Sequence, residues 1–348
     1  MSAVTARLRT CTAYVYDHRP AARRRYPRIA VQAFFEGKYV DLAEAKVNVM
    51  THALNYGTGV FEGIRGYWND DEEQLLLFRV REHFERIHRS ARIMRIEIAY
   101  SVDELIEICS NVVRTSGFRE DVYVRPLAYK SALQIGLSMV TETPSGSRLI
   151  DDEFVLFAVP FGNYLDIEKP IRCTIASWRR VNDNMIPPRG KITGTYVNSS
   201  MAKTEAVEAG FDEAIMLTHD GHVSEGTGEN LFIVRDGVLV TPSVSEDILE
   251  GITRNTIIQI ARDELSISTI ERPLDRTELF IADELFLVGT GAQISPVCEI
   301  DGRMIGTGEI GSVTRALQDL YFDIVRGRNP AYRDWCLGIQ NSTVIGNV

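Results

Sequence analysis

Three Asp-Gly pairs in the second half of the chain constrain its fold more than any other feature. Each pair lies between runs of apolar or β-branched residues; the pairs are Asp220-Gly221, Asp236-Gly237 and Asp301-Gly302. An Asp-Gly pair in this setting favours the tight turn of a β-hairpin, because the central residues of that turn need positive φ angles. We therefore predict that the second half of the chain is rich in strands and antiparallel in part.

Helices are predicted between these strands. Two of the three longer segments end just before a glycine, which commonly closes a helix because it adopts the left-handed conformation freely. A shorter helix is predicted after Asp275, since Asp275 and Glu278 have the spacing of a capping box. The three longer segments are residues 196–209, 253–265 and 312–326.

The first half of the chain combines strands with two helices. Strands are expected around residues 29–35 and at Val47, where β-branched and aromatic residues gather. One helix is expected over residues 80–94. A second helix begins at the capping box Ser101-Val-Asp-Glu104 and stops at Gly117.

Two domains are expected from the positions of segments rich in turn-forming residues. Residues 141–152 are rich in Ser, Gly and Pro and predict an exposed loop, and strand character resumes over residues 154–160. Over residues 161–170, Gly, Asn, Asp and Pro accumulate, which is typical of a linker. The predicted parts are an arginine-rich, solvated arm over residues 1–28, a small first domain over 1–160, a linker over 161–170 and a larger second domain over 171–348.

The composition describes a soluble globular protein: of 348 residues, 45% are hydrophobic and 25% are charged. A net charge of −10 argues against a nucleic-acid partner, which requires a basic face. No apolar run reaches the roughly 18 residues that cross a bilayer, so we expect no membrane association and a cytoplasmic location. Neither cysteines nor histidines show the spacing of metal ligands, so no metal site is expected.

Lys191 and the segments after it carry the chemistry. Lys191-Ile-Thr-Gly-Thr-Tyr196 is followed by Glu225-Gly-Thr-Gly-Glu-Asn-Leu-Phe232 and by Leu249-Glu-Gly-Ile-Thr-Arg254. Taken alone, Lys191 would be an ordinary loop lysine. Pyridoxal phosphate needs an amine, an anion at its pyridine nitrogen and donors for its phosphate, and the three segments offer one candidate for each.

The stretch from Glu225 through Leu239-x-Thr241 to Gly251-Ile-x-Arg254 resembles the signature of the class IV aminotransferases, and most closely that of the branched-chain amino acid aminotransferases. The resemblance covers roughly residues 35–317. It implies the α/β architecture of a fold type IV enzyme, with a small α/β domain, a larger strand-rich pseudo-barrel domain and the cofactor between them. It also implies a homodimer, or an assembly of dimers, whose interface closes the site.

The resemblance assigns each part of a cofactor site. Lys191 would bind pyridoxal 5'-phosphate as a Schiff base, Glu225 would keep the pyridine nitrogen protonated, and Tyr196 would donate to the phenolate oxygen. Residues 251–253 open a predicted helix, where free N–H groups favour an anion, and Arg86 matches a bidentate phosphate ligand of similar enzymes. The implied cofactor-binding residues are Arg86, Lys191, Tyr196, Glu225, Gly228, Leu249, Ile252, Thr253 and Thr290.

The resemblance also assigns a substrate pocket. In Tyr123-Val-Arg125-Pro, the arginine would accommodate the side-chain carboxylate of glutamate, while apolar groups accept leucine, isoleucine and valine. Gly289-Thr290-Gly291-Ala292 resembles the turn whose N–H groups hold the α-carboxylate, although similar enzymes commonly carry Ala in place of Gly291. The implied substrate-binding residues are Tyr56, Phe61, Tyr123, Arg125, Leu137, Tyr164, Gly291 and Ala292, with Tyr56 and Leu137 expected from the neighbouring subunit.

The implied function is transfer of an amino group between L-leucine, L-isoleucine or L-valine and 2-oxoglutarate, so amino acids and 2-oxo acids are the expected partners. Two alternatives share the fold: a D-amino acid or (R)-amine aminotransferase, and an aminodeoxychorismate lyase. Tyr123-x-Arg125 favours the branched-chain interpretation, whereas Gly291 leaves an (R)-amine side activity open. A paralogue without turnover would be expected to lack Lys191 or Glu225, and both are present.

Overall fold

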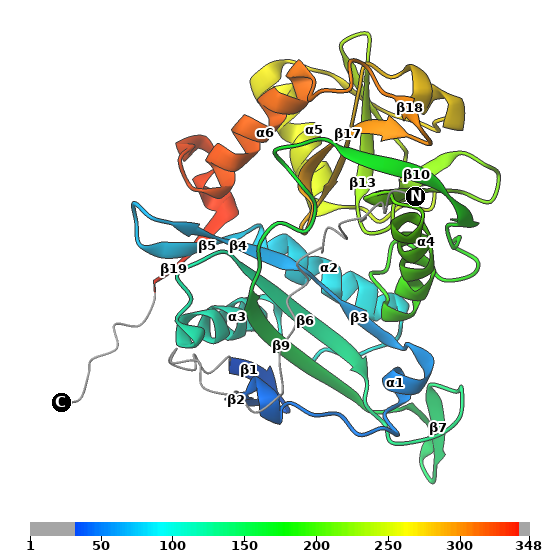
Figure 1. Cartoon of the computed structure of the whole chain (residues 1–348). Coiled ribbons are helices and arrows are strands. Elements are labelled where there is room, and N and C mark those ends of the chain that lie inside the picture. The colour runs from blue at the N-terminus through cyan, green and yellow to red at the C-terminus, as the bar shows by residue number, and fades with distance from the viewer. Residues whose placement is uncertain (1–31, 341–348) are drawn as a thin grey trace, which may run out of the picture.

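The computed structural model describes residues 32–340, whose strands form two large sheets and one small hairpin (Figure 1). The chain builds the first sheet, crosses to the second through residues 161–170 and returns to the first at its carboxyl-terminal end. The predicted α/β class with a strand-rich second half is confirmed. The arm predicted over residues 1–28 lies outside the described residues.

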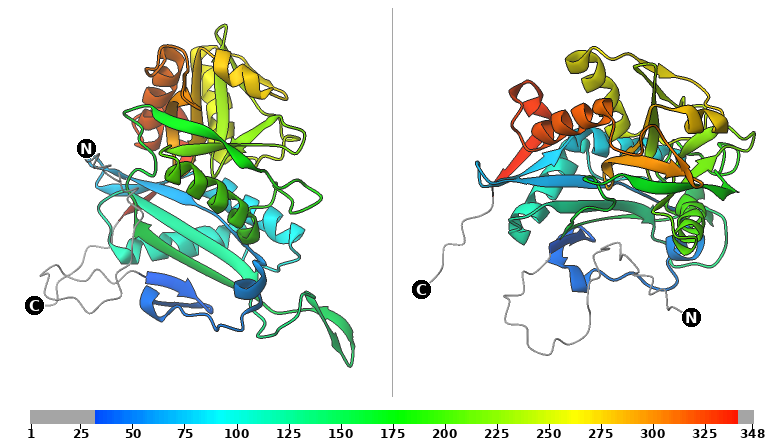
Figure 2. Two further views of the ribbon diagram at one scale, coloured as in Figure 1. Left: turned by 45° about the vertical axis from the view of Figure 1, so that its right-hand side comes forward. Right: turned by 45° about the horizontal axis from the view of Figure 1, so that its top comes forward.

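The first sheet is antiparallel throughout, and its strands run in the order β19-β5-β4-β6-β9-β1-β2, with β3 also paired to β6. The helices α2 and α3 cover one of its faces (Figures 1 and 2). The elements are β1 (Gln32–Phe35), β2 (Lys38–Asp41), α1 (His52–Tyr56), β3 (Gly59–Phe61), β4 (Ile64–Asn69), β5 (Gln74–Phe78), α2 (Val80–Ile93), α3 (Val102–Ser116), β6 (Val122–Lys130), β9 (Asp152–Pro160) and β19 (Cys336–Gln340).

Alternation along β6 and β9 gives this sheet two different faces. Successive side chains of a strand point to opposite sides, so Val122 and Val124 on β6 and Leu156 on β9 enter the core under α2 and α3. Tyr123 and Arg125, between the core residues of β6, point the other way. The face opposite the helices is therefore the one that is available for a site.

The second sheet is mixed, in the order β12-β11-β10-β17-β16-β13-β14-β15, with β18 paired to β17. Its parallel pairs join β10 to β11, β10 to β17 and β14 to β15. The elements are β10 (Ile171–Arg179), α4 (Tyr196–Glu208), β11 (Glu213–Leu217), β12 (Val223–Gly226), β13 (Asn230–Arg235), β14 (Val238–Thr241), α5 (Ile252–Leu265), β15 (Thr269–Glu271), β16 (Glu284–Gly289), β17 (Gln293–Ile300), β18 (Arg303–Met304) and α6 (Ser312–Val325).

Helices pack on the second sheet through separate apolar clusters. Alanines of α4, including Ala202 and Ala206, allow that helix to lie close against Ala214 and Met216 of β11. The helices α5 and α6 share a larger cluster with β13, β16 and β17. That cluster also takes Tyr67 from the first sheet, whose hydroxyl lies 3.1 Å from the hydroxyl of Tyr321 on α6, so the two sheets share part of one core.

The local turn and cap predictions are confirmed. All three Asp-Gly pairs connect antiparallel strands, and in two of them both residues have positive φ, for example 52° at Asp236 and 76° at Gly237. The capping boxes at Ser101 and Asp275 are both formed, the second on a short 3₁₀ helix, Arg276–Ile281. The five longer predicted helices are found within a residue or two of their expected bounds.

Two predictions were wrong, and several elements were not foreseen. Val47 lies in an irregular segment and is half-exposed, because β2 ends at Asp41 and a short 3₁₀ helix follows it. Residues 141–152 are not a loop: β7 (Val140–Thr143) and β8 (Gly146–Leu149) pair as an exposed hairpin that stands away from the body (Figures 1 and 2). The unforeseen elements include β3, β4, β5 and β6 of the first sheet, and β19, which pairs with β5 more than 250 positions away.

Among residues 32–340, no helix is both long enough and apolar enough to cross a bilayer. Within the same range, no group of three or more His, Cys, Asp or Glu side chains is placed to hold a metal ion.

Candidate active site

A cavity of about 770 Å³ lies between the two sheets and takes its walls from both. Its size is in the range that suits a small ligand together with a cofactor. Most of the predicted site residues meet there: Phe61, Arg86, Tyr123, Arg125, Tyr164, Lys191, Tyr196, Glu225, Gly228, Leu249, Ile252, Thr253, Thr290 and Gly291 all line it.

Lys191 is held by its backbone against the first sheet and α2. Its N–H donates to Ser90 Oγ of α2 at 3.1 Å, and its carbonyl accepts from Phe61 N–H of β3 at 3.0 Å. The side chain then points into the cavity, where Nζ donates to the hydroxyl of Tyr196 at 2.7 Å and lies 5.0 Å from the centre of the Phe61 ring. Lys191 is the one lysine among the described residues that line the cavity.

Glu225 lies near the end of β12 and is a buried carboxylate with three partners. Oε1 pairs with Arg180 Nη2 at 2.7 Å, and Oε2 accepts from Asn230 Nδ2 at 2.9 Å and from Leu249 N–H at 3.1 Å. Burial raises the pKa of Glu225, although the charges of Arg180 and Lys191 oppose that shift. A carboxylate accepts about four hydrogen bonds, so one position stays available for a donor in the cavity.

The amino end of α5 forms another part of the wall. Gly251 is its N-cap, no side chain caps it in the described chain, and Gly251, Ile252 and Thr253 all line the cavity. Free N–H groups and the positive end of the helix dipole favour an anion at such a place. A Cβ at Gly251 would collide with Asn230 Oδ1, so only glycine fits there.

Arg86 lies beside this helix end as half of a buried ion pair. Its Nε and Nη2 donate to the two carboxylate oxygens of Glu62, both at 2.7 Å, and Nη1 donates to the Glu250 carbonyl at 3.0 Å. Of its five N–H groups, three are thus used, and two have no partner among residues 32–340. Burial alone would raise the pKa of Glu62, but Arg86 and His83 together hold it well below its usual range.

The opposite wall of the cavity is largely aromatic and apolar. The second faces of β6 and β9 contribute Tyr123, Arg125, Phe157 and Val159, and the segment after β9 contributes Tyr164. The guanidinium of Arg125 lies 4.4 Å from the centre of the Phe61 ring, and Nη2 donates to the Tyr123 hydroxyl at 3.1 Å. Its Nε is buried without a partner in the described chain. Arg125 therefore brings unused donors into an apolar setting.

Three predicted substrate residues do not line this cavity. Ala292 is buried directly behind the turn at Gly291. Tyr56 and Leu137, which were expected to serve a neighbouring subunit, lie on the outside, and Leu137 is 80% exposed. The Tyr56 hydroxyl accepts a hydrogen bond of 3.0 Å from Gly136 N–H, so these two residues belong to one surface.

The sequence interpretation missed other residues of the site. Arg180 was missed because nothing in its local sequence marks it as the partner of Glu225, 45 positions further on. Glu229 lies within the recognised motif but was assigned no role, although it is buried and lines the cavity. Gly63 was also assigned no role, although it lines the cavity and a Cβ there would collide with the hydroxyl of Tyr123.

Comparison with known proteins decides the family. The family model described as Amino-transferase class IV matches residues 59–300, which include both walls of the cavity. The chain belongs to the class IV aminotransferases. It is 50% identical over 303 residues to a probable branched-chain-amino-acid aminotransferase of Aquifex aeolicus, covering 87% of this chain and 95% of the relative.

Solved structures agree with this membership. A branched-chain aminotransferase of Thermoproteus uzoniensis, solved with norvaline, is 46% identical with a TM-score of 0.83, covering 89% of this chain and 99% of that one. The branched-chain amino acid aminotransferase of Thermobaculum terrenum, solved in its PLP form, is 36% identical with a TM-score of 0.81, covering 89% and 98%. This chain is a pyridoxal-phosphate-dependent aminotransferase by family.

The residues present in this class IV aminotransferase fit the cofactor of its family. The uncapped end of α5 and the two unused N–H groups of Arg86 suit a phosphate. The unused acceptor position of Glu225 suits a protonated ring nitrogen. Lys191 and Tyr196 lie between these places in the lining of the same cavity.

A second buried carboxylate stands beside Glu225. Glu229 lies against Glu213, which is fully buried and bonded to Thr227 Oγ1 and Lys203. Burial and then the charge of Glu213 raise the pKa of Glu229 to about 8, although Lys203 and the N–H of Gly228 oppose the shift. The folded protein therefore keeps a proton on this carboxyl near neutral pH.

The raised pKa of Glu229 predicts a pH-dependent stability. In the unfolded chain this carboxyl has an ordinary pKa of 4.5, so its stabilising contribution is complete below that pH. The contribution is lost as pH rises toward about 8, because only the folded state still holds the proton there. Glu229→Gln cannot ionise, so we expect its free energy of unfolding relative to the parent to rise between pH 5 and 8, by at most about 1.4 kcal/mol per pH unit.

Urea unfolding at a series of pH values measures this difference. The exposed Glu168 provides a matched control, and Glu168→Gln should differ from the parent by a constant amount across the range. A constant difference for Glu229→Gln as well would contradict the raised pKa.

Proposed function

We propose that this chain transfers the amino group between a branched-chain L-amino acid and 2-oxoglutarate, with pyridoxal 5'-phosphate held in the cavity between the two sheets. When bound, the cofactor supplies an electrophilic carbon for the amino group and a ring that withdraws electrons from the substrate Cα. The proposal is supported by the family, by the names of the relatives and by the single arginine in the apolar wall.

Some residues of the site would hold the cofactor, and others would transfer a proton. Arg86, Thr253 and the end of α5 would hold the phosphate, and Glu225 would hold a proton on the ring nitrogen. Lys191 would release its covalent hold on the cofactor when the amino acid binds and then carry a proton from the substrate Cα at its freed Nζ. Tyr196, which accepts a hydrogen bond from Nζ, orients that amine.

The position of Arg125 in the apolar wall is the observation that supports the proposed choice of substrate. One pocket has to accept the apolar side chain of leucine in one half-reaction and the second carboxylate of glutamate in the other. Phe61, Phe157 and Val159 provide the apolar surface, and Arg125 provides buried donors in the middle of it. The arginine keeps its aliphatic stem and its ring contacts in either case, so leucine needs no new partner.

The rival activities of this fold account less well for that arrangement. A D-amino acid or (R)-amine aminotransferase remains the alternative because Gly291, with no side chain, stands in the turn expected to hold the α-carboxylate. An aminodeoxychorismate lyase is the other. Assays of the wild-type protein with L-leucine, D-alanine and (R)-1-phenylethylamine as amino donors to 2-oxoglutarate separate these activities, and a preference for either of the last two would overturn the branched-chain assignment.

Arg125→Leu tests the substrate assignment within the protein itself. We expect the half-reaction with glutamate to fall by at least about 100-fold, because leaving a buried charge without its partner costs about 3–5 kcal/mol. The half-reaction with L-leucine should change by less than about threefold, since leucine makes no charged contact there. Single-turnover spectroscopy of the cofactor-loaded protein measures both rates, and an equal fall in both would assign Arg125 to the α-carboxylate or to structure.

We also propose that the functional unit is a homodimer. A surface of exposed apolar side chains joins residues 49–54 to residues 133–137, and the two segments are tied by the Thr51–Leu133 bridge and by the contacts of His52. This surface contains Leu137 and the neighbouring Tyr56, which have no place in the cavity of their own chain. The apolar side chains of this surface are Val49, Met50, Leu54, Leu133, Ile135 and Leu137.

A charge in the middle of this surface should weaken the dimer. For Leu137→Arg we expect a larger fraction of monomer in sedimentation velocity and a raised KM for L-leucine, because the partner would lose part of its pocket wall. Ile281→Arg, at an exposed apolar residue of another element, is the matched control. A monomeric wild-type protein would refute the proposal.

A further inference from the structure

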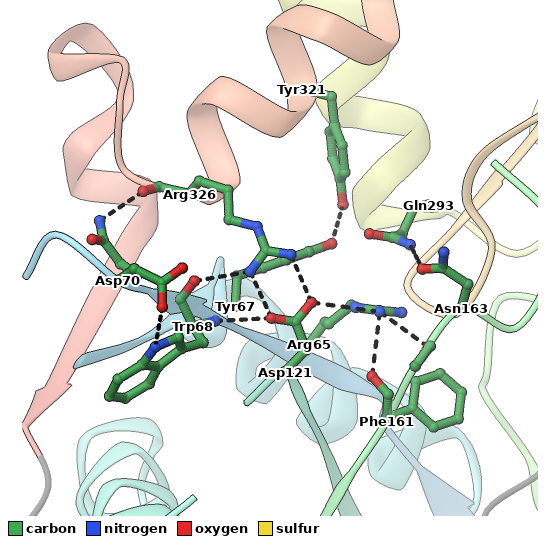
Figure 3. A network of polar contacts seen from close by, with 12 residues as sticks. Arg65, Tyr67, Trp68, Asp70, Asp121, Phe161, Asn163, Gln293, Tyr321 and Arg326 are labelled. Atoms are coloured by element: carbon green, nitrogen blue, oxygen red, sulfur yellow. Dashed lines mark hydrogen bonds and ion pairs between the residues drawn. The ribbon is translucent and has the colours of Figure 1, made fainter. Parts of the chain in front are cut away.

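Arg65 is a buried arginine of β4 that no step of the reaction uses. It is 2% exposed and does not line the cavity. Its guanidinium donates to three backbone carbonyls: Nη1 to Gly291 at 3.3 Å, and Nη2 to Phe161 at 3.4 Å and to Gly162 at 3.1 Å. Figure 3 shows the bond from Arg65 to the Phe161 carbonyl. Charge-assisted bonds to carbonyls are stronger than those between neutral groups, so Arg65 is an anchor for these two segments.

Both of the anchored segments form part of the cavity wall. Gly291 lies in the turn between β16 and β17, and Phe161 opens the crossing between the two sheets. The segments also touch each other, since Gln293 Nε2 donates to Asn163 Oδ1 at 3.1 Å, and a Cβ at Gly291 would lie 3.6 Å from Tyr164 Cβ. Arg65 therefore fixes the turn and the crossing segment in one arrangement.

A second arginine and a shared carboxylate hold Arg65 in turn. Asp121 Oδ2 lies 3.8 Å from Arg65 Nη2, and the same carboxylate accepts two bonds from Arg326, at 2.6 and 2.9 Å (Figure 3). Arg326 closes the end of α6 and also donates to the Trp68 carbonyl at 2.8 Å. The rings of Tyr67 and Phe161 complete its surroundings, with each ring centre 5.4 Å from Cζ of Arg65.

The bond to Gly291 acts on the turn that lines the cavity. It ties the Gly291 carbonyl to a buried guanidinium and so limits rotation of the peptide between Gly291 and Ala292. Thr290 and Gly291, which line the cavity, come directly before this peptide and are held with it. An anion-binding turn gains affinity when it is fixed in this way, since its donors need no reordering when the anion arrives.

We infer that Arg65 is a positioning residue for substrate: it fixes the turn over residues 289–292 against the crossing segment, and Asp121 and Arg326 keep it in place from the end of α6. The inference rests on the proposed function, because it takes this turn as the binding site of the substrate α-carboxylate. It assigns to the Arg65–Asp121–Arg326 network control of substrate affinity without contact with substrate.

Arg65→Met is the first test, carried out on the cofactor-loaded protein. We expect KM for L-leucine to rise about tenfold or more and kcat to change by less than about threefold, because positioning of this kind serves ground and transition states alike. The dissociation constant of 4-methylvalerate, which carries a carboxylate and the leucine side chain, should rise by a similar factor. The dissociation constant of the neutral 4-methylvaleramide in the same variant should stay within about threefold of the parent value.

Conservative variants keep the inference testable if Arg65→Met does not fold. Arg65→Lys retains the charge but loses the planar guanidinium that reaches both segments. Asp121→Asn leaves Arg65 intact but without its counter-charge. Both variants should bind 4-methylvalerate more weakly than the parent, but less weakly than Arg65→Met does. Arg172→Met removes an arginine paired with Glu299 away from the cavity and should change nothing.

The outcomes separate this inference from the proposed function. If the wild-type protein does not transfer amino groups from L-leucine, the proposed function fails. The affinity of the Arg65 and Asp121 variants for 4-methylvalerate still tests the positioning role of Arg65 in that case. Unchanged affinity for 4-methylvalerate in the Arg65 and Asp121 variants, or equal weakening of the acid and the amide, would overturn the inference.

Discussion

The buried ion pair between Glu62 and Arg86 is the interaction on which the rest of the site depends. Removing a carboxylate from water is costly, and here two bonds from Arg86 and a contact of 2.7 Å with His83 offset the cost. Because Glu62 follows β3 and Arg86 lies on α2, the pair fixes the helix to the first sheet. The third bond of Arg86, to the Glu250 carbonyl, extends that order to the start of α5 in the second half.

The functional face follows from this arrangement by simple periodicity. Once α2 and α3 cover one face of the first sheet, alternation along β6 leaves Tyr123 and Arg125 on the other, facing Lys191 and Glu225. The backbone of Lys191 donates to Ser90 Oγ and accepts from Phe61 N–H, and these two bonds place Lys191 against the first half, although its chain position lies in the second. The site therefore exists only where the halves meet, and every wall of the cavity depends on their relative placement.

Local features of the fold could be predicted from the sequence, and non-local ones could not. The Asp-Gly turns and the capping box at Ser101 depend on neighbouring residues, so their patterns were sufficient. The pairing of β19 with β5, the bond from Arg180 to Glu225 and the bond from Arg65 to Gly291 depend on distant parts of the chain, which leave no local signal. The motif pointed to residues that line the cavity, and the geometry added the groups that hold them.

The proposed function depends on a covalent link between pyridoxal 5'-phosphate and Lys191. Reduction of the cofactor-loaded protein with borohydride, followed by peptide mapping, detects this link, because reduction makes the bond between cofactor and lysine permanent. We predict a single labelled peptide that contains Lys191, and no label in a Lys191→Ala variant that still binds cofactor through Arg86 and the end of α5. Label on another lysine, such as Lys203 or Lys130, would contradict the account.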